Sequence, residues 1–167
     1  MNIKIKARTV GAVVSLVILM LSYSTQAANL VANSSAEIRE PVALSELVPL
    51  SFGAIMRSTQ SDTVTLGSDG SLSDTTGSYQ FSGASTPGVM KITGAKDSFV
   101  SISFGTGSIE DGASTMVMKD FTHNAGTTPQ LDANGDLIVN IGAALDVAAN
   151  QQAGLYNGTY NITVNYQ

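Results

Sequence analysis

The residues that could do catalytic or metal chemistry are few and lie far apart along the chain. The single histidine, His123, stands in a small, polar stretch, and the chain has no cysteine. A zinc site usually combines histidine and cysteine ligands, so this chain would need carboxylates for nearly all of them. Gly83-Ala84-Ser85 begins like the Gly-x-Ser-x-Gly turn of a serine hydrolase, but Thr86-Pro87 breaks the pattern. We predict no enzymatic activity, no metal site and no cofactor.

Two acidic segments are the remaining candidates. Asp132-Ala-Asn-Gly-Asp136 begins like a calcium loop, but an EF-hand would need a glycine at Leu137 and a bidentate carboxylate at Ala143. Because Asn-Gly favours the positive φ angles of a tight hairpin, a turn explains this segment, and calcium binding at Asp132–Asp136 stays open. Glu110 and Asp111 are adjacent, as solvated carboxylates commonly are. Paired carboxylates of a glycoside hydrolase meet only in space, so sequence leaves that activity open.

The first 27 residues have the three zones of a secretory signal peptide. A basic start precedes a mostly apolar run at Val10–Leu21, and Thr25-Gln26-Ala27 fits the small-x-small rule for cleavage. The apolar run is too short to cross a bilayer, which needs about 20 residues. We therefore predict a cleaved leader at residues 1–27 and no membrane span after cleavage. The mature chain is expected in the periplasm and then at the cell surface or outside the cell.

The charge of the predicted mature chain excludes one class of partner. All 13 acidic residues follow Ala27, whereas three of the 8 basic ones precede it, which leaves a net charge of −8. Nucleic-acid binding needs clustered lysine and arginine, and the five that remain are scattered. Without cysteine, the domain must be held by apolar burial and sheet hydrogen bonds.

The clearest structural signal is the last stretch, Gly154–Gln167. Its residues alternate strictly between aromatic or aliphatic types and polar types, which is typical of one long β-strand with a buried face and a polar face. Aromatic and β-branched residues suit such a half-buried surface. The residues expected on the buried face are Tyr156, Gly158, Tyr160, Ile162, Val164 and Tyr166.

Shorter runs of the same kind recur along residues 36–167, and no long helical pattern interrupts them. We expect a loop at Gly105–Gly112 and an interruption at Gly142 within the strand that starts at Leu137. The predicted fold is all-β: an immunoglobulin-like or pilin-like antiparallel β-sandwich of seven to nine strands in one domain, residues 36–167. Residues 28–35 form an N-terminal extension. The expected strands include Thr63–Leu66, Val89–Thr93, Ser98–Phe104, Met116–Phe121 and Leu137–Ile141.

Two stretches carry a resemblance to known proteins. Leu50-Ser-Phe-Gly-Ala-Ile55 and Gly154-x-Tyr-x-Gly-Thr-Tyr-x-Ile-Thr-Val-x-Tyr166 resemble an uncharacterised family of exported bacterial β-sandwich domains. Met116–Phe121, Leu131–Gly135 and Ile141–Leu145 match its general layout, so the likeness covers nearly all of the mature chain. The alternating end with its penultimate tyrosine also looks like the end of chaperone–usher pilus (fimbrial) subunits.

That resemblance implies a filament subunit whose sandwich lacks one strand. A periplasmic chaperone would first fill the gap, and the N-terminal segment of the next subunit would replace it by β-strand addition, with an outer-membrane usher as a further partner. The acceptor groove would be bordered by the face Tyr156, Tyr160, Ile162, Val164 and Tyr166. The donor candidates in this sequence are Leu30, Ala32, Ala36 and Ile38.

The alternative function is a self-sufficient exported sandwich that binds a carbohydrate or a surface partner without polymerising. The two hypotheses differ in the completeness of the sheet. A subunit should leave one side of its last strand unpaired, whereas a monomeric binder should have a closed sheet and a polar or aromatic pocket.

A charge on the buried face of the last stretch tests the strand prediction. Ile162→Asp or Val164→Asp would bury an unpaired carboxylate, so each should prevent accumulation of the exported protein. The amount of folded protein in the exported fraction measures this. Normal export and folding of both variants would show that this face is not buried.

Overall fold

The computed structural model describes residues 28–167, and within them every regular element is a β-strand. The predicted all-β class is confirmed. Twelve strands are present in these residues instead of seven to nine, because four of them have only two or three residues. The predicted leader, residues 1–27, lies outside the described residues. The strands are β1 (Ala43–Val48), β2 (Ala54–Ile55), β3 (Asp62–Leu66), β4 (Leu72–Asp74), β5 (Phe81–Ser82), β6 (Gly88–Thr93), β7 (Val100–Phe104), β8 (Gly107–Glu110), β9 (Thr115–His123), β10 (Asp136–Val147), β11 (Asn157–Thr159) and β12 (Ile162–Tyr166).

The chain divides after Ala36 into two units, one residue beyond the predicted end of the extension. Residues 28–36 contain no strand, and their side chains are exposed. Residues 37–167 carry all twelve strands.

The central strand of the domain is β10, which belongs to an eight-stranded antiparallel sheet. Its first half pairs with β6 and its second half with β3, while its other edge pairs with β9. The order of strands is β1-β6-β10-β9-β8-β11, with β3 and β4 beside the second half of β10. From Val139 to Val147 every residue of β10 is buried except Asn140 and Asp146, which are half-buried, and Leu145 is fully enclosed. This strand therefore supplies the floor of the core along its whole length.

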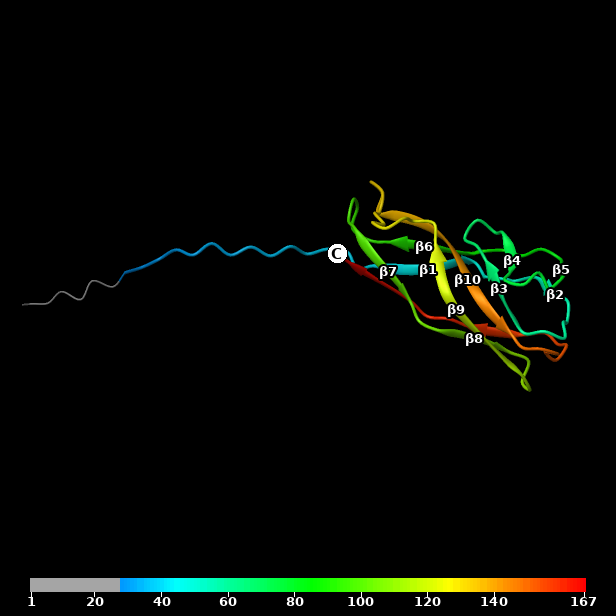
Figure 1. The fold of residues 1–167 in the computed structure, drawn as a ribbon. Coiled ribbons are helices and arrows are strands. Elements are labelled where there is room, and N and C mark those ends of the chain that lie inside the picture. The colour runs from blue at the N-terminus through cyan, green and yellow to red at the C-terminus, as the bar shows by residue number, and fades with distance from the viewer. Residues whose placement is uncertain (1–27) are drawn as a thin grey trace, which may run out of the picture. The chain divides into compact units, whose positions relative to one another are not determined.

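A second sheet of only two strands, β7 and β12, packs against the first. Figure 1 shows the C-terminal strand, in red, running beside β7, in green. Val100 of β7 and Ile162 of β12 meet Ile92 of β6 and Val139 of β10 in one apolar cluster. A second cluster, around Leu145, lies at the other end of the first sheet. Two sheets facing each other across an apolar interior make a β-sandwich.

Two predicted interruptions of the strand pattern are wrong, and each has a structural reason. Gly107–Glu110 is not a loop, because β8 pairs with β9 on one edge and β11 on the other. Gly142 does not interrupt β10; the backbone of Leu66 and Gly67 passes so close that a Cβ on Gly142 would collide with it. Glycine in a strand can mark such a close approach instead of a break.

The last stretch is not one strand but two. It breaks at Tyr160–Asn161, opposite the gap between β7 and β8, and Gly105 N donates to Asn161 O across the break at 3.0 Å. At this point the ladder passes from the two-stranded sheet to the eight-stranded one. The predicted alternation is present at Tyr156, Tyr160, Ile162, Val164 and Tyr166, which are half-buried with exposed residues between them, but Gly158, also predicted on the buried face, is exposed.

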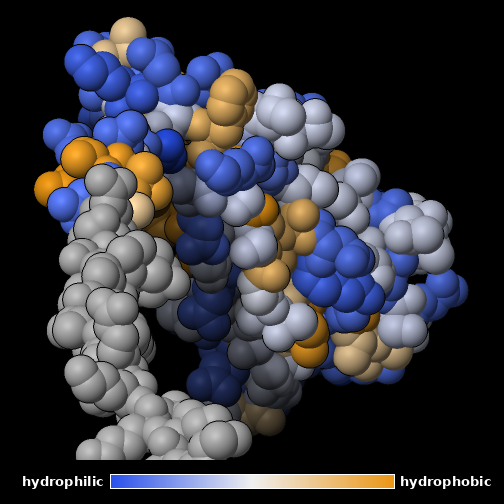
Figure 2. Space-filling view, turned by 90° about the vertical axis from the view of Figure 1, so that its left-hand side faces the viewer, coloured by the Kyte–Doolittle hydropathy of each residue, from blue (hydrophilic) through white to orange (hydrophobic). Residues whose placement is uncertain are grey.

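The surface is mixed in character. On the face drawn in Figure 2, hydrophobic atoms lie in small separate groups between hydrophilic ones. Within residues 28–167 no helix is long and apolar enough to cross a membrane.

The role of β10 can be tested by truncating one buried side chain. Leu145→Ala should lower the free energy of unfolding by about 2–5 kcal/mol, because it leaves a cavity in the apolar cluster under β10. Ile138→Ala, on the exposed face of the same strand, is the matched control and should change it by less than about 0.5 kcal/mol. Urea unfolding measures both values. Equal losses would show that β10 is not the floor of the core.

Candidate functional site

Two long segments of the domain are paired on one side only. Residues 43–56 pair with residues 81–93 through β1–β6, the bridge between Ser51 and Thr86, and β2–β5. Residues 157–166 pair with residues 100–110 through β11–β8 and β12–β7. Within the described part of the chain, no strand pairs with the other edge of β1, β11 or β12. Such edges present unpaired N–H and C=O groups that can pair with another strand.

A groove of about 750 Å³ lies between these two segments. Residues 49–57 form one wall and residues 151–158 form the other, and Tyr160 also lines the groove. The side chains on its floor are the buried and half-buried apolar residues of the Leu145 cluster. We call this space the edge groove. Its floor residues are Tyr79, Ile109, Met116, Met118, Leu145 and Val147.

The edge groove is apolar and opens to solvent. On its rim Met56 is 56% exposed, and Leu155 is exposed as well. Among its lining residues, Arg57 is the one with a charged side chain. Open apolar grooves of this size in a domain commonly mark an interaction site for another chain or a ligand.

The strand β1 continues the same wall beyond the edge groove. Leu44 lies opposite Ile92 and Glu46 opposite Met90, so both face the interior side of the sheet. All six residues of β1 are nevertheless exposed. The second sheet has only two strands, which leaves the inner face of β1 without cover. Sequence patterns did not point to Leu44 or Glu46, because β1 mixes polar and apolar residues without strict alternation.

Tyr166 joins the two edges at the far end from the edge groove. Its hydroxyl accepts a hydrogen bond from Ala95 N at 2.7 Å and donates one to Glu40 O at 2.6 Å. A Cβ on Gly94 would overlap the Tyr166 hydroxyl, so glycine is required there. Tyr166 thus fixes the chain just before β1 against the end of β12. We refer to these two hydrogen bonds as the Tyr166 clasp.

Tyr160 stands between the two apolar clusters and contacts both. Its ring stacks on Phe121 at 5.0 Å, and Phe121 stacks on Phe104 at 5.3 Å. The hydroxyl is buried and has no hydrogen-bond partner within the described residues. Burial, with a smaller effect of the Glu46 carboxylate, raises the pKa of Tyr160 above its ordinary value. The hydroxyl lies against Gly88, where a Cβ would come within 2.8 Å of it.

The predicted donor residues precede β1 in the chain. Leu30 and Ile38 are 90% and 98% exposed, and Ala32 and Ala36 are exposed too. They make no strand in the chain as described. Their role as donors stays a prediction.

The acidic candidates form turns. Asp132 accepts hydrogen bonds from the backbone N–H groups of Asn134 and Asp136 at 2.8 and 2.9 Å, and these bonds lower the pKa of its carboxyl. Of the Asn-Gly pair, Gly135 has the predicted positive φ and Asn134 does not, so the turn is not the type I′ turn that the pair favours. Asp111 likewise accepts from the N–H groups of Ala113 and Ser114, which lower its pKa. Both carboxylates hold the backbone of a turn.

His123 is the last residue of β9. It is half-buried, its Nδ1 accepts a hydrogen bond from Ala125 N at 3.2 Å, and its ring lies 6.0 Å from that of Phe104. A β-bulge brings it inward: Asp120 has φ +48°, and the register with β10 shifts at this point. The bulge turns Phe121 and His123 toward the interior, where Asp120 would otherwise point.

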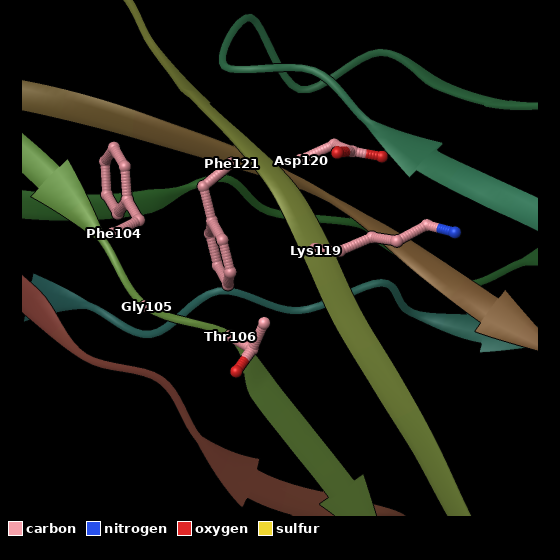
Figure 3. A pocket seen from close by; sticks show the side chains of 6 residues that line it. All are labelled: Phe104, Gly105, Thr106, Lys119, Asp120 and Phe121. Carbon is pink, nitrogen blue, oxygen red and sulfur yellow. The ribbon is translucent and has the colours of Figure 1, made fainter.

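A second, shallower hollow lies where β9 passes the gap between β7 and β8. Figure 3 shows Phe104 and Phe121 side by side, with Lys119 and Asp120 pointing away from the two rings. The Lys119 ammonium is 2.6 Å from the Asp146 carboxylate, whose hydrogen bond raises the pKa of Lys119. Within residues 28–167 no group of three histidines or carboxylates comes together. The edge groove is therefore the stronger candidate site.

Comparison with known proteins identifies a family but no activity. The family model described as "Domain of unknown function (DUF4402)" matches residues 42–166. No curated protein and no solved structure matches the chain. The matched region begins just before β1 and ends at the last residue of β12. It therefore contains both walls of the edge groove and excludes residues 28–41.

The Tyr166 clasp can be tested by removing one oxygen. Tyr166→Phe leaves Ala95 N–H and Glu40 C=O without their partner, so the free energy of unfolding should fall by about 1–3 kcal/mol. Tyr156→Phe is the matched control: its hydroxyl donates to Gln152 O at 2.8 Å in an exposed turn, and the loss should be smaller. Chemical unfolding measures stability, and hydrogen exchange at Ala95 reports the clasp. Unchanged exchange at Ala95 would contradict it.

Proposed function

We propose that this chain, which belongs to the DUF4402 family, is a structural subunit of a bacterial surface filament that assembles by β-strand addition. The observation that carries the proposal is the edge groove together with the unpaired outer edges of β1, β11 and β12. An added strand would pair its backbone with residues 156–166 and cover apolar side chains that are now exposed. Burial of apolar area and new main-chain hydrogen bonds are the two sources of affinity in this mode of recognition.

The occupant that fits is residues 28–38 of a second copy of the chain. This segment has eleven residues, and the unpaired edge from Tyr156 to Tyr166 has eleven as well. Apolar and small side chains alternate with others along it, so one face can enter the groove. Glu37 is the one charged side chain among residues 28–38, so the segment adds little charge repulsion against an acidic domain. We call residues 28–38 the arm.

Geometry favours an arm from another copy over the chain's own arm. The Tyr166 clasp holds Glu40 at the end of β12, so the arm's last residue must lie near Tyr166 in its own chain. Its own arm could then run only parallel to β12. An antiparallel arm would need Ile38 near Tyr156, about 33 Å away at 3.3 Å per residue, which two residues cannot span. A second copy is free to add antiparallel, the slightly more stable pairing.

The exposed edge groove also implies that a free subunit must be protected from aggregation before it assembles. A free subunit exposes the edge groove and two strand edges, which are a liability for aggregation. We infer an exported subunit that meets a periplasmic chaperone and an outer-membrane usher and ends in a filament at the cell surface. The predicted leader at residues 1–27 is the basis for export.

Assembly can be tested on residues 28–167 with substitutions on one face of the arm. Leu30→Asp with Ile38→Asp should abolish species larger than the monomer, because both carboxylates would enter an apolar groove. Val31→Asp with Asn33→Asp adds the same charge to the opposite face and should leave assembly unchanged. Size-exclusion chromatography with light scattering measures the species. All four positions are exposed in the free chain, so folding is not expected to change.

Two results would overturn the proposal. If the unsubstituted chain stays monomeric at every concentration, no strand addition occurs, and the alternative of a non-polymerising binder remains. If both double variants lose assembly equally, association depends on charge and not on the apolar face of the arm.

A further inference from the structure

The two long segments that are paired on one side only differ in how strongly their outer edges resist a further strand. Within the described residues, one such edge belongs to β1 and the other to residues 156–166. An unpaired edge accepts other strands unless prolines, bulges or inward-pointing charges obstruct it. These obstacles are concentrated at β1.

Three of the obstacles occur along β1. Pro41 precedes it by two residues and Pro49 follows it directly, and a proline has no N–H to offer a further strand. The register with β6 shifts between Glu46 and Val48, as it does at a β-bulge. Finally, Glu46 lies opposite Met90, so an edge strand carries a carboxylate on its inner face.

The ribbon at residues 154–167 has none of these features. It contains no proline and no charged side chain. No register shift interrupts the pairing of β11 with β8 or of β12 with β7. Its half-buried residues are tyrosine, isoleucine and valine, and the polar residues between Asn157 and Asn165 are neutral. A strand added along residues 156–166 would therefore meet no charged side chain of this edge.

The Glu46 carboxylate is not neutralised by a neighbouring cation. The ion pairs within residues 28–167 join Arg39 to Glu37, Lys91 to Asp136 and Lys119 to Asp146. Burial first, and then the charge of Glu46, raise the pKa of Tyr160, which places this carboxylate on the side of the interior. Leu44 lies on the same face of β1 and is 41% exposed. Without the charge of Glu46, the inner face of β1 would be apolar and open to another strand.

We propose that Glu46 prevents a second copy of the chain from pairing with β1, and so leaves residues 156–166 as the edge that accepts an added strand. The second half of this inference rests on the proposed function. Antiparallel pairing of β1 with β1 of a second copy, inner faces on one side, would put the two Glu46 residues opposite each other. A register shifted by two residues would put each Glu46 opposite Leu44. Like charges in the first register destabilise the pair, and an apolar partner in the second leaves the carboxylate uncompensated.

Pairing through β1 can be measured in a chain whose arm is blocked. The parent is residues 28–167 with Leu30→Asp and Ile38→Asp, which is expected to be monomeric. Glu46→Val in this parent should form dimers at about tenfold lower concentration, because it removes two facing charges per dimer and adds apolar contact. Sedimentation over a series of concentrations measures dimer formation. Hydrogen exchange should show slower exchange at the β1 amides in the dimer.

Two matched controls separate the charge from added hydrophobicity. Ser45→Val introduces the same side chain on the opposite face of β1, in line with Lys91, and should leave the parent monomeric. Glu46→Lys replaces one charge by another and should also leave it monomeric, because two lysines repel each other as two glutamates do. All residues of β1 are exposed, so none of these variants is expected to unfold, and the melting temperature checks this.

The outcomes distinguish this inference from the proposed function. Glu46→Val chains that stay monomeric at every concentration would overturn the role of Glu46, as would dimers of either control or dimers without protection at β1. A labelled peptide of residues 28–38, titrated against the parent, should saturate at one peptide per chain. Two per chain would show that β1 also accepts an arm, which overturns the inference and supports strand addition. A peptide that does not bind would overturn the proposed function, while the dimer measurements would still decide whether Glu46 protects β1.

Discussion

The two-stranded second sheet is the constraint on which the rest of the structure depends. β7 and β12 pair with each other, and the outer edge of β12 pairs with no strand of the described residues. A sheet of two strands cannot cover a first sheet that extends from β11 to β1. The exposure of β1, the half-burial of the last ribbon and the edge groove all follow from this shortage. All three features have this one cause.

The first sheet compensates by being long and continuous. β10 pairs along its whole length, and the Lys119–Asp146 ion pair and the hydrogen bond from Thr63 to Asp146 tie β9, β10 and β3 together on its outer surface. The aromatic stack of Phe104, Phe121 and Tyr160 then connects this sheet to the ribbon at the point where the ladder changes sheets. The first sheet is thus held together by its own pairing and polar contacts, while the outer edge of β12 stays unpaired.

The sequence predicted those features of the structure that depend on a local residue pattern. The alternation from Tyr156 to Tyr166 identified the half-buried face, and Asn134-Gly135 identified a turn with positive φ, because both effects depend on neighbouring residues alone. Other features depend on residues far away in the chain. Gly142 looked like a break because the backbone of Leu66, which it accommodates, lies 76 positions earlier. The edge groove needed both walls, and the unpartnered hydroxyl of Tyr160 needed Gly88, which no periodicity could bring together.

The Tyr166 clasp has a mechanical consequence. A pull on the chain ahead of Glu40 reaches the Tyr166 hydroxyl before it reaches the β1–β6 ladder. Because the same oxygen is bonded to Ala95, the load divides between the end of β12 and the turn after β6. The exposed edge strand β1 is thereby shielded from tension by a single side chain.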